Sequence, residues 1–409
     1  MRTKFIQFGT AQAPADRSAT GKMPVSRLPG DARTGWREML AAGLYQTGAL
    51  RMLQGLSRSH ELRSDARRSF PRWRKVSTAK FAILYYHRIG TEGIPYYSKL
   101  APETFEAQMR YLRERYRVVS LEQLLRELGD PEATGQAVAV TFDDGYRDNY
   151  TQAFPILKTY GVPATIFLTV HCIETGEVAW YDRVFLALQA LADEELHLEL
   201  DGPRRFLISS PRARIRTATE IVSCLRRMPD QRRQQCCAAL EKQVALPAVE
   251  LADRMLTWEQ VRQMYQAGIA FGSHTMTHPV VSWLAPAEAE RELLESKRIL
   301  EKRLGCPVQD FAYPFGQPAD CGDAATALLA RCGYRSAATT SWGIQTPGAD
   351  LYRLRRVQFG EDCSLAMFAF KLNQLFFHVE EDTLGAAPAV ESPALEAAAD
   401  GPRGLGGES

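Results

Sequence analysis

Two short segments far apart in the chain carry the side chains best suited to chemistry. Asp143 and Asp144 follow the apolar run 138–142, and His274 and His278 stand four residues apart further along. The apolar run predicts a short buried strand, so both carboxylates lie where the chain leaves a sheet. One carboxylate and two imidazoles can hold a divalent ion and leave positions open for water and substrate. The other carboxylate is the kind of group that a hydrolase uses as its base.

By residue type, the metal ligands are His274, His278 and one member of the pair Asp143 and Asp144; the spacing does not decide which one. Nitrogen and oxygen ligands favour Zn²⁺, and Co²⁺, Ni²⁺ or Fe²⁺ fit the same set. Such an ion polarises a carbonyl and lowers the pKa of its water towards about 7. The alternative interpretation is structural, with the aspartates capping a helix and the histidines packed in the interior.

Three motifs resemble those of a known family. Residues 141–145 (TFDDG), 273–279 (SHTMTHP) and 311–316 (FAYPFG) are similar to the motifs of the polysaccharide deacetylases, the NodB-homology proteins of carbohydrate esterase family 4. The resemblance spans roughly residues 81–359. It implies an α/β fold, a distorted and incomplete (β/α) barrel, and removal of N-acetyl groups from N-acetylhexosamines of a polysaccharide or glycan precursor. It also implies that Asp144 is the ligand and Asp143 the base.

The proton donor is harder to identify. In most of the family a Leu-x-His near the end of the domain provides it, and the only downstream histidine here is His378. His87 follows the apolar run 81–86 and resembles the Tyr-His of the branch that deacetylates poly-β-1,6-N-acetylglucosamine, where the motif order is circularly permuted. Catalytic groups of barrels gather at the carboxyl ends of strands. We therefore predict His87 as the general acid; the alternative is a core histidine bonded to a backbone carbonyl.

The third motif predicts the acetyl pocket, lined by Tyr313, Pro314, Phe315 and Gly316. The resemblance implies that the Phe315 N–H donates to the oxyanion, and Gly316 lets the backbone come close. The arginine that usually opens this motif and orients the base is replaced by Ala312. The candidates to replace it lie in the segment 352–357, which is expected to be the last strand: Arg353, Arg355 and Arg356.

Composition bounds the class of protein. The 409 residues are 45% hydrophobic and 24% charged, as in ordinary globular proteins, and the net charge of +2 gives no argument for nucleic acid binding. No apolar run approaches the roughly 20 residues of a membrane span, and residues 1–23 lack the apolar core of a signal peptide. We expect a protein of the cytoplasm or the inner membrane face, or an extracytoplasmic one if the start codon is misassigned. Eight scattered cysteines favour free thiols, and no feature indicates an oligomeric state.

The chain is expected to divide into four parts, one of which carries an insertion. We expect disorder over 1–35 and 379–409, a basic amphipathic helical segment over 36–75, and a catalytic domain over 76–378 with a helical insertion at about 172–256. Segment 36–75 either packs on the catalytic domain or lies on an anionic membrane surface. The insertion is expected to be a lid or side wall. Its many arginines form a solvated helix face or, alternatively, contact a polyanionic glycan or a lipid-linked sugar.

Two rival functions remain open. The same ion and base would serve an esterase that removes O-acetyl groups from sugars. The domain could instead be a carbohydrate-binding relic, with Ala312 marking decay of the site. The presence of all five candidate catalytic and ligand residues argues against decay: His87, Asp143, Asp144, His274 and His278.

Overall fold

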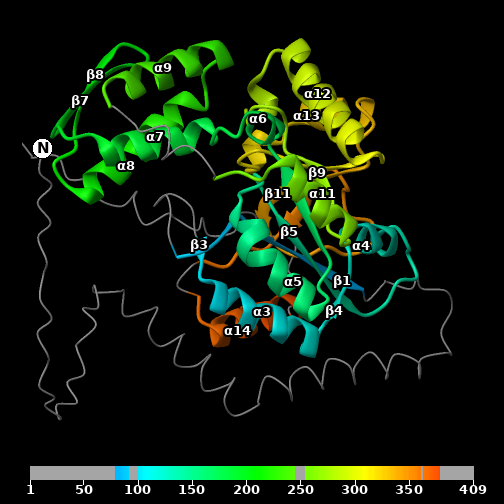
Figure 1. The fold of residues 1–409 in the computed structure, drawn as a ribbon. Coiled ribbons are helices and arrows are strands. Elements are labelled where there is room, and N and C mark those ends of the chain that lie inside the picture. Colours follow the sequence, from blue (N-terminus) through cyan, green and yellow to red (C-terminus); the bar gives the residue numbers. More distant parts are fainter. Residues whose placement is uncertain (1–78, 92–98, 245–253, 361–362, 378–409) are drawn as a thin grey trace, which may run out of the picture.

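Apolar strands alternate with helices through most of the chain that the computed structural model describes, which comprises residues 79–91, 99–244, 254–360 and 363–377. The strands form one eight-stranded sheet, in which seven strands follow the order β1-β5-β6-β9-β10-β11-β12 and β4 pairs with β5 outside this order (Figure 1). Every pair of strands in this sheet is parallel. Its strands are β1 (Lys80–Tyr86), β4 (Arg117–Val118), β5 (Gln136–Phe142), β6 (Ala164–Leu168), β9 (Ala270–Ser273), β10 (Asp310–Ala312), β11 (Ser336–Trp342) and β12 (Leu354–Arg356).

The two ends of this sheet meet. Val357, directly after β12, donates its N–H to the Ile83 carbonyl at 2.8 Å and accepts from the Tyr85 N–H at 3.1 Å. The sheet therefore curls into a nearly closed barrel, and the expectation of a distorted, incomplete (β/α) barrel is confirmed. Because all of its strands run in one direction, their carboxyl ends gather at one rim.

Helices pack around the barrel, with α3 and α14 side by side at the lower edge of Figure 1 and α12 and α13 at its upper right. Each helix buries one stripe; in α4 the buried positions are Leu121, Leu124, Leu125 and Leu128. The helices around the barrel are α3 (Pro102–Arg115), α4 (Leu121–Leu128), α5 (Phe154–Tyr160), α6 (Val170–Thr175), α11 (Trp258–Gln266), α12 (Pro286–Leu304), α13 (Asp323–Arg331) and α14 (Leu365–Phe377).

Three short turns and one strand pair complete this part. The helix expected over 149–160 begins as a π-helical turn, because Pro155 lacks the N–H that an α-helix would use there. The short 3-10 turns both follow strand ends at the rim. These elements are η2 (Asn149–Ala153), η3 (Val281–Trp283), η4 (Pro318–Asp320), and the pair β2 (Arg88–Ile89) and β3 (Lys99–Leu100).

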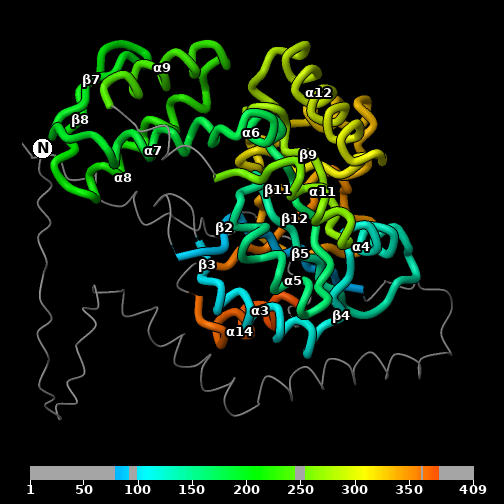
Figure 2. The backbone as a smooth tube through the Cα atoms, viewed as in Figure 1, coloured from blue at the N-terminus to red at the C-terminus, as the bar shows by residue number. Residues whose placement is uncertain are grey.

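The insertion between β6 and β9 forms a separate group of elements, seen at the upper left of Figure 2. It contains the expected helices α7 (Trp180–Ala190), α8 (Pro211–Leu225) and α9 (Asp230–Lys242). It also contains an antiparallel hairpin of β7 (Glu195–Glu199) and β8 (Pro203–Leu207), which the prediction of a helical insertion did not include. The sequence ELHLE alternates buried and exposed residues with the period of a strand, and Gly202 adopts a left-handed backbone conformation in the turn.

Several predictions concern residues outside the described ranges: the segments 1–35, 36–75 and 379–409, and His378. The predicted domain boundaries stay predictions. All eight cysteines lie within the described ranges and none is in a disulfide, as expected. Among the described helices, none has both the length and the apolar character needed to span a bilayer.

Candidate active site

Five strands deliver the candidate residues to the carboxyl rim of the barrel. Asp143 and Asp144 follow β5 and His274 follows β9, while His87 follows β1. The third motif continues from β10, and Arg356 is the last residue of β12. Residues that are far apart in the chain therefore meet because parallel strands end at the same level.

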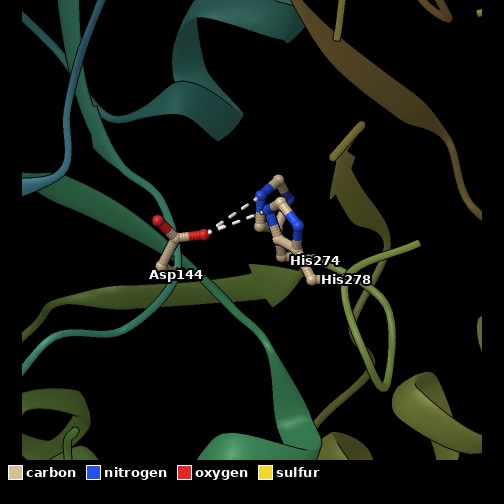
Figure 3. Close-up of side chains that lie close together, drawn as sticks. All are labelled: Asp144, His274 and His278. Carbon is tan, nitrogen blue, oxygen red and sulfur yellow. Dashed lines mark ion pairs between the residues drawn. The ribbon is translucent and has the colours of Figure 1, made fainter. Parts of the chain in front are cut away.

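Asp144, His274 and His278 converge to form a potential metal site (Figure 3). The Asp144 Oδ1 atom lies 3.4 Å from His274 Nε2 and 3.3 Å from His278 Nε2, and all three side chains are at most 4% exposed. No hydrogen-bond donor among the described residues reaches either carboxylate oxygen of Asp144. A buried carboxylate without donors is costly. The three side chains, together with a carboxylate that has no hydrogen-bond partner, fit a divalent cation held by one oxygen and two nitrogen ligands.

The protonation states also suit metal binding. Burial acts to raise the pKa of Asp144, but the His278 imidazole, whose Nε2 lies 3.3 Å from Oδ1, holds this pKa far below its usual range together with the charges of His87 and His274. Burial lowers the pKa of His274 to about 4. The aspartate is therefore ionised and His274 neutral at pH 7, as metal ligands must be.

Neighbouring groups orient both imidazoles. His274 donates from Nδ1 to the Ala312 carbonyl at 2.7 Å, which leaves Nε2 as the acceptor facing Asp144. The His278 ring packs against the rings of Tyr181 and Phe315, with centres 4.7 and 5.0 Å away. Its backbone carbonyl accepts a hydrogen bond from Trp180 Nε1 at 3.2 Å. The His274 ring is thus oriented by a hydrogen bond, and the His278 ring is positioned by packing between two aromatic rings.

The two histidines are brought together by a tight loop. Thr275 and His278 have left-handed φ values of 68° and 61°, and the buried Glu292 carboxylate accepts hydrogen bonds from the N–H groups of Met276 and Thr277 and from the Thr277 hydroxyl. All non-glycine residues with positive φ in the described part of the chain lie in the three motifs: Asp144, Thr275, His278 and Phe315. Strained backbone of this kind concentrates at functional sites.

Asp143 has a different environment from its neighbour. Arg356 donates from Nη1 and Nη2 to its two carboxylate oxygens at 2.8 and 2.7 Å, and both side chains are buried. Arg356 is itself fixed by donation from Nε to the Thr339 carbonyl at 2.8 Å and by the Tyr85 ring 4.4 Å from its Cζ. Burial acts to raise the pKa of Asp143, but the charges of Arg356 and His274 and the Arg356 hydrogen bonds outweigh it and lower this pKa.

Among the three candidate arginines, Arg356 is therefore the one that contacts Asp143. Arg353 instead pairs with Asp323 and Asp350 at the surface, and Arg355 is exposed. The alternation of β12 explains this, because Leu354 and Arg356 point to the interior and Arg355 points outward.

His87 follows β1 at the level of the two aspartates. In the register of β1 and β5, Tyr86 pairs with Phe142, so His87 is level with Asp143, whose N–H donates to the Tyr86 carbonyl at 3.0 Å. Positive charge on His87 lowers the pKa of Asp143 and of Asp144. Its imidazole is partly exposed, and Nδ1 lies 3.4 Å from Nε2 of Gln358.

The third motif forms a wall beside His278. Tyr313 is buried, and Pro314 accepts a hydrogen bond from the Gly316 N–H at 2.7 Å. A side chain at Gly316, where φ is 63°, would meet the Thr340 backbone nitrogen at 2.9 Å, so only glycine fits. Phe315, with φ of 61°, places its ring against His278.

Four contributors to this site were not predicted from the sequence. Glu292 of α12 holds the histidine loop, and Trp180, Tyr181 and Arg226 come from the insertion. The adjacent aromatic residues Trp180 and Tyr181 that open α7 were the one available signal, since Trp and Tyr are enriched at interfaces. Nothing in the spacing of Arg226 or Glu292 indicates these long-range contacts.

Comparisons with known proteins identify relatives of this chain. The family model described as polysaccharide deacetylase matches residues 130–337. The YxkH protein of Bacillus subtilis (strain 168), which is named as a polysaccharide deacetylase, is 24% identical over 292 residues, covering 71% of this chain and 75% of that protein. The poly-β-1,6-N-acetyl-D-glucosamine N-deacetylase of Escherichia coli (strain K12) is 34% identical over 88 residues, which is 20% of this chain and 13% of that protein.

Among solved structures, the Streptococcus pyogenes deacetylase PplD, determined in complex with acetate, superimposes with a TM-score of 0.50. It is 23% identical, and the match covers 73% of this chain and 98% of that one. The barrel fold is therefore shared with PplD.

Proposed function

Because the chain belongs to the polysaccharide deacetylase family, we propose that it is a metal-dependent hydrolase that removes N-acetyl groups from N-acetylhexosamine residues of a polysaccharide or glycan precursor. The observation that carries the proposal is the contrast between two adjacent buried aspartates. Asp144 faces two histidines, and neither of its carboxylate oxygens receives a hydrogen bond from the described residues. Asp143 is held ionised by its ion pair with Arg356. A ligand and a separate base are what hydrolysis assisted by a metal needs.

In this mechanism Asp143 takes the proton of the attacking water. Its ion pair with Arg356 keeps the carboxylate ionised and aimed, and at the same time makes it a weaker base. Asp144, His274 and His278 would hold a divalent ion, most simply Zn²⁺, which would polarise the acetyl carbonyl and lower the pKa of bound water. A weak base is then sufficient.

The remaining steps fall to His87 and the third motif. His87, partly exposed beside Asp143, protonates the departing amine. The wall formed by Tyr313, Pro314, Phe315 and Gly316 holds the acetyl methyl, and the Phe315 N–H donates to the developing negative charge on the acetyl oxygen. In support of this role, no backbone carbonyl among the described residues accepts the Phe315 N–H.

The first substrate to test is a β-1,6-linked N-acetylglucosamine oligomer. The support is the name of the Escherichia coli relative, together with the position of His87 after a Tyr-Tyr strand end. The experiment measures acetate release from N-acetylated and O-acetylated oligosaccharides, using full-length protein stripped with a chelator and then reloaded with Zn²⁺, Co²⁺, Ni²⁺ or Fe²⁺.

We expect acetate release from N-acetylated oligomers that disappears on stripping and returns on reloading. Release from O-acetylated sugars alone would identify an esterase instead. Failure to bind metal and to release acetate from any substrate would contradict the proposal and favour a carbohydrate-binding relic.

A further inference from the structure

Arg226, just after α8 in the insertion, reaches across to the third motif of the barrel. Its Cζ atom lies 4.6 Å from the centre of the Phe315 ring and 4.9 Å from the centre of the Trp283 ring. Both contacts have the geometry of cation–π interactions, to which a planar guanidinium is well suited. One side chain from the insertion therefore links two aromatic residues of the barrel rim.

A buried carboxylate anchors this arginine. Arg226 Nη2 lies 2.7 Å from Oδ1 of Asp320, whose side chain is fully buried. The other carboxylate oxygen, Oδ2, accepts the Gln317 N–H at 3.0 Å. The ion pair thus extends through Asp320 to the turn that directly follows Phe315 and Gly316. Arg226 therefore contacts the third motif at the Phe315 ring and, through Asp320, at the turn that follows it.

These contacts distinguish Arg226 from the arginines of a solvated helix face. Its side chain is 23% exposed, and its Nε is buried. The neighbouring Arg227 is exposed. The guanidinium of Arg226 is ordered because it pairs with a buried aspartate and stacks on two rings. It therefore restricts the movement of Asp320, Trp283 and Phe315.

Phe315 is the residue whose position matters most here. Its ring lies against His278, and its backbone has a left-handed φ of 61°, which a non-glycine residue keeps only when its surroundings enforce it. The insertion contributes further neighbours of this ring, Trp180 and Tyr181, with ring centres at 6.1 and 6.4 Å. The barrel supplies Phe315, and the insertion encloses it.

We propose that Arg226 is a positioning residue through which the insertion sets the size of the acyl pocket, so that the acetyl group is accepted and longer acyl groups are rejected. The inference rests on the proposed function, because it takes Phe315 as the pocket wall. It assigns a role to the insertion, which acts on specificity through the wall of the site.

The first experiment measures acyl selectivity. The ratio of kcat/KM for N-acetyl over N-propionyl glucosamine oligomers is determined for wild type, Arg226→Ala, Arg226→Lys and the control Arg227→Ala. A well-formed apolar pocket discriminates one methylene by about 10- to 200-fold. We expect Arg226→Ala to reduce this ratio about tenfold while metal content is unchanged, and Arg227→Ala to leave the ratio at the wild-type value.

Arg226→Lys separates positioning from folding. Lysine keeps a charge for Asp320 and hence the stability, but a compact ammonium cannot stack on both rings. We expect it to lose selectivity as the alanine variant does. Wild-type selectivity in Arg226→Lys, or in Arg226→Ala, would overturn the proposal, since the stacked guanidinium would then not shape the pocket.

A second experiment requires no substrate. Urea unfolding of Arg226→Ala, Asp320→Asn and the double variant forms a cycle, and we expect the two changes to be clearly non-additive because the side chains are in contact. Additive effects on the free energy of unfolding would show that the ion pair between Arg226 and Asp320 does not couple the insertion to the barrel. If wild type released no acyl group at all, the proposed function would fail, and this cycle would still decide whether the insertion is tied to the third motif through Arg226.

Discussion

Asp143 and Asp144 are neighbours in the sequence, yet the fold treats their charges in opposite ways. Asp143 receives two hydrogen bonds from a buried arginine, and its pocket is complete within the protein. Asp144 is equally buried, faces two imidazoles, and has no donor among the described residues for either oxygen. The Asp143 carboxylate is neutralised by an arginine of the protein, whereas the Asp144 carboxylate has room for a cation that binds from outside.

The difference teaches where stability and function separate. Removing one partner of a buried ion pair leaves an uncompensated charge, so the Asp143 half contributes to folding. The Asp144 half has no such partner, and we expect it to gain stability when a cation binds. Substitutions on the two sides should therefore have different signatures in metal content, turnover and unfolding.

The largest effect is expected from Asp144→Asn. We expect the bound metal to fall from about one ion per chain to nearly none, and acetate release to fall by about 10⁴-fold or more, since several kcal/mol of transition-state stabilisation are lost. Added metal should stabilise wild type against urea and leave the variant unaffected, because an ion stabilises only a folded state that binds it. Elemental analysis, turnover and unfolding check this, with the surface variant Glu122→Gln as control. Retained metal would contradict the division of the site.

Asp143→Asn should show the complementary pattern. As a base and not a ligand, its loss should leave metal content nearly intact while kcat falls by about 10²- to 10⁴-fold. The matched variant is Asp144→Asn, one residue away with the same chemical change. Metal lost together with activity in Asp143→Asn would mean that the two aspartates have been assigned the wrong way round.

His87→Ala tests whether the residue at the level of the two aspartates is the acid. We expect turnover to fall by about 10²-fold, metal to be retained, and the alkaline limb of the pH–rate profile to disappear, because that limb reports the acid losing its proton. His171→Ala, at an exposed position of α6, is the control and should keep the limb. His378→Ala should be nearly silent. A profile that moves only in His378→Ala would exclude His87.

Arg356→Met should have the smallest effect on turnover, about 10- to 100-fold, as expected for a residue that orients another. The clearer readouts are stability and pH. The free energy of unfolding at pH 7 should fall by about 3–5 kcal/mol, because the Asp143 charge stays buried without its partner. Arg353→Met, which removes surface pairs, should cost about 1 kcal/mol or less.

The pH dependence follows from the lowered pKa of Asp143. In wild type the stabilisation from the pair is present above the unfolded pKa of about 3.9 and is lost as the pH falls through the lower folded value. Without Arg356, burial dominates and raises this pKa. The acid limb of the rate profile should then shift to higher pH, and the variant should gain stability on mild acidification. An unmoved acid limb would show that Asp143 is not the titrating base.

Much of the fold could be predicted from residue patterns. The apolar runs before His87, Asp143 and His274 are strands in the structure, and their sequential alternation with helices indicated parallel pairing. The hairpin in the insertion was missed because five alternating residues are a weak signal inside a charged, helix-rich segment. The π turn at the start of α5 depends on Pro155 and was likewise not predicted.

By itself, the sequence determined which side chains stand at strand ends, and therefore which chemistry can meet at the carboxyl rim. Only the tertiary structure decided which arginine binds Asp143. Arg353, Arg355 and Arg356 are the same residue type and differ only in the direction in which their side chains point. The tertiary structure alone also brought Arg226 to Phe315 and left Asp144 without a donor. The physical reason is that residue type and local period depend on neighbours in the chain, whereas an ion pair or a missing partner depends on where distant segments pack.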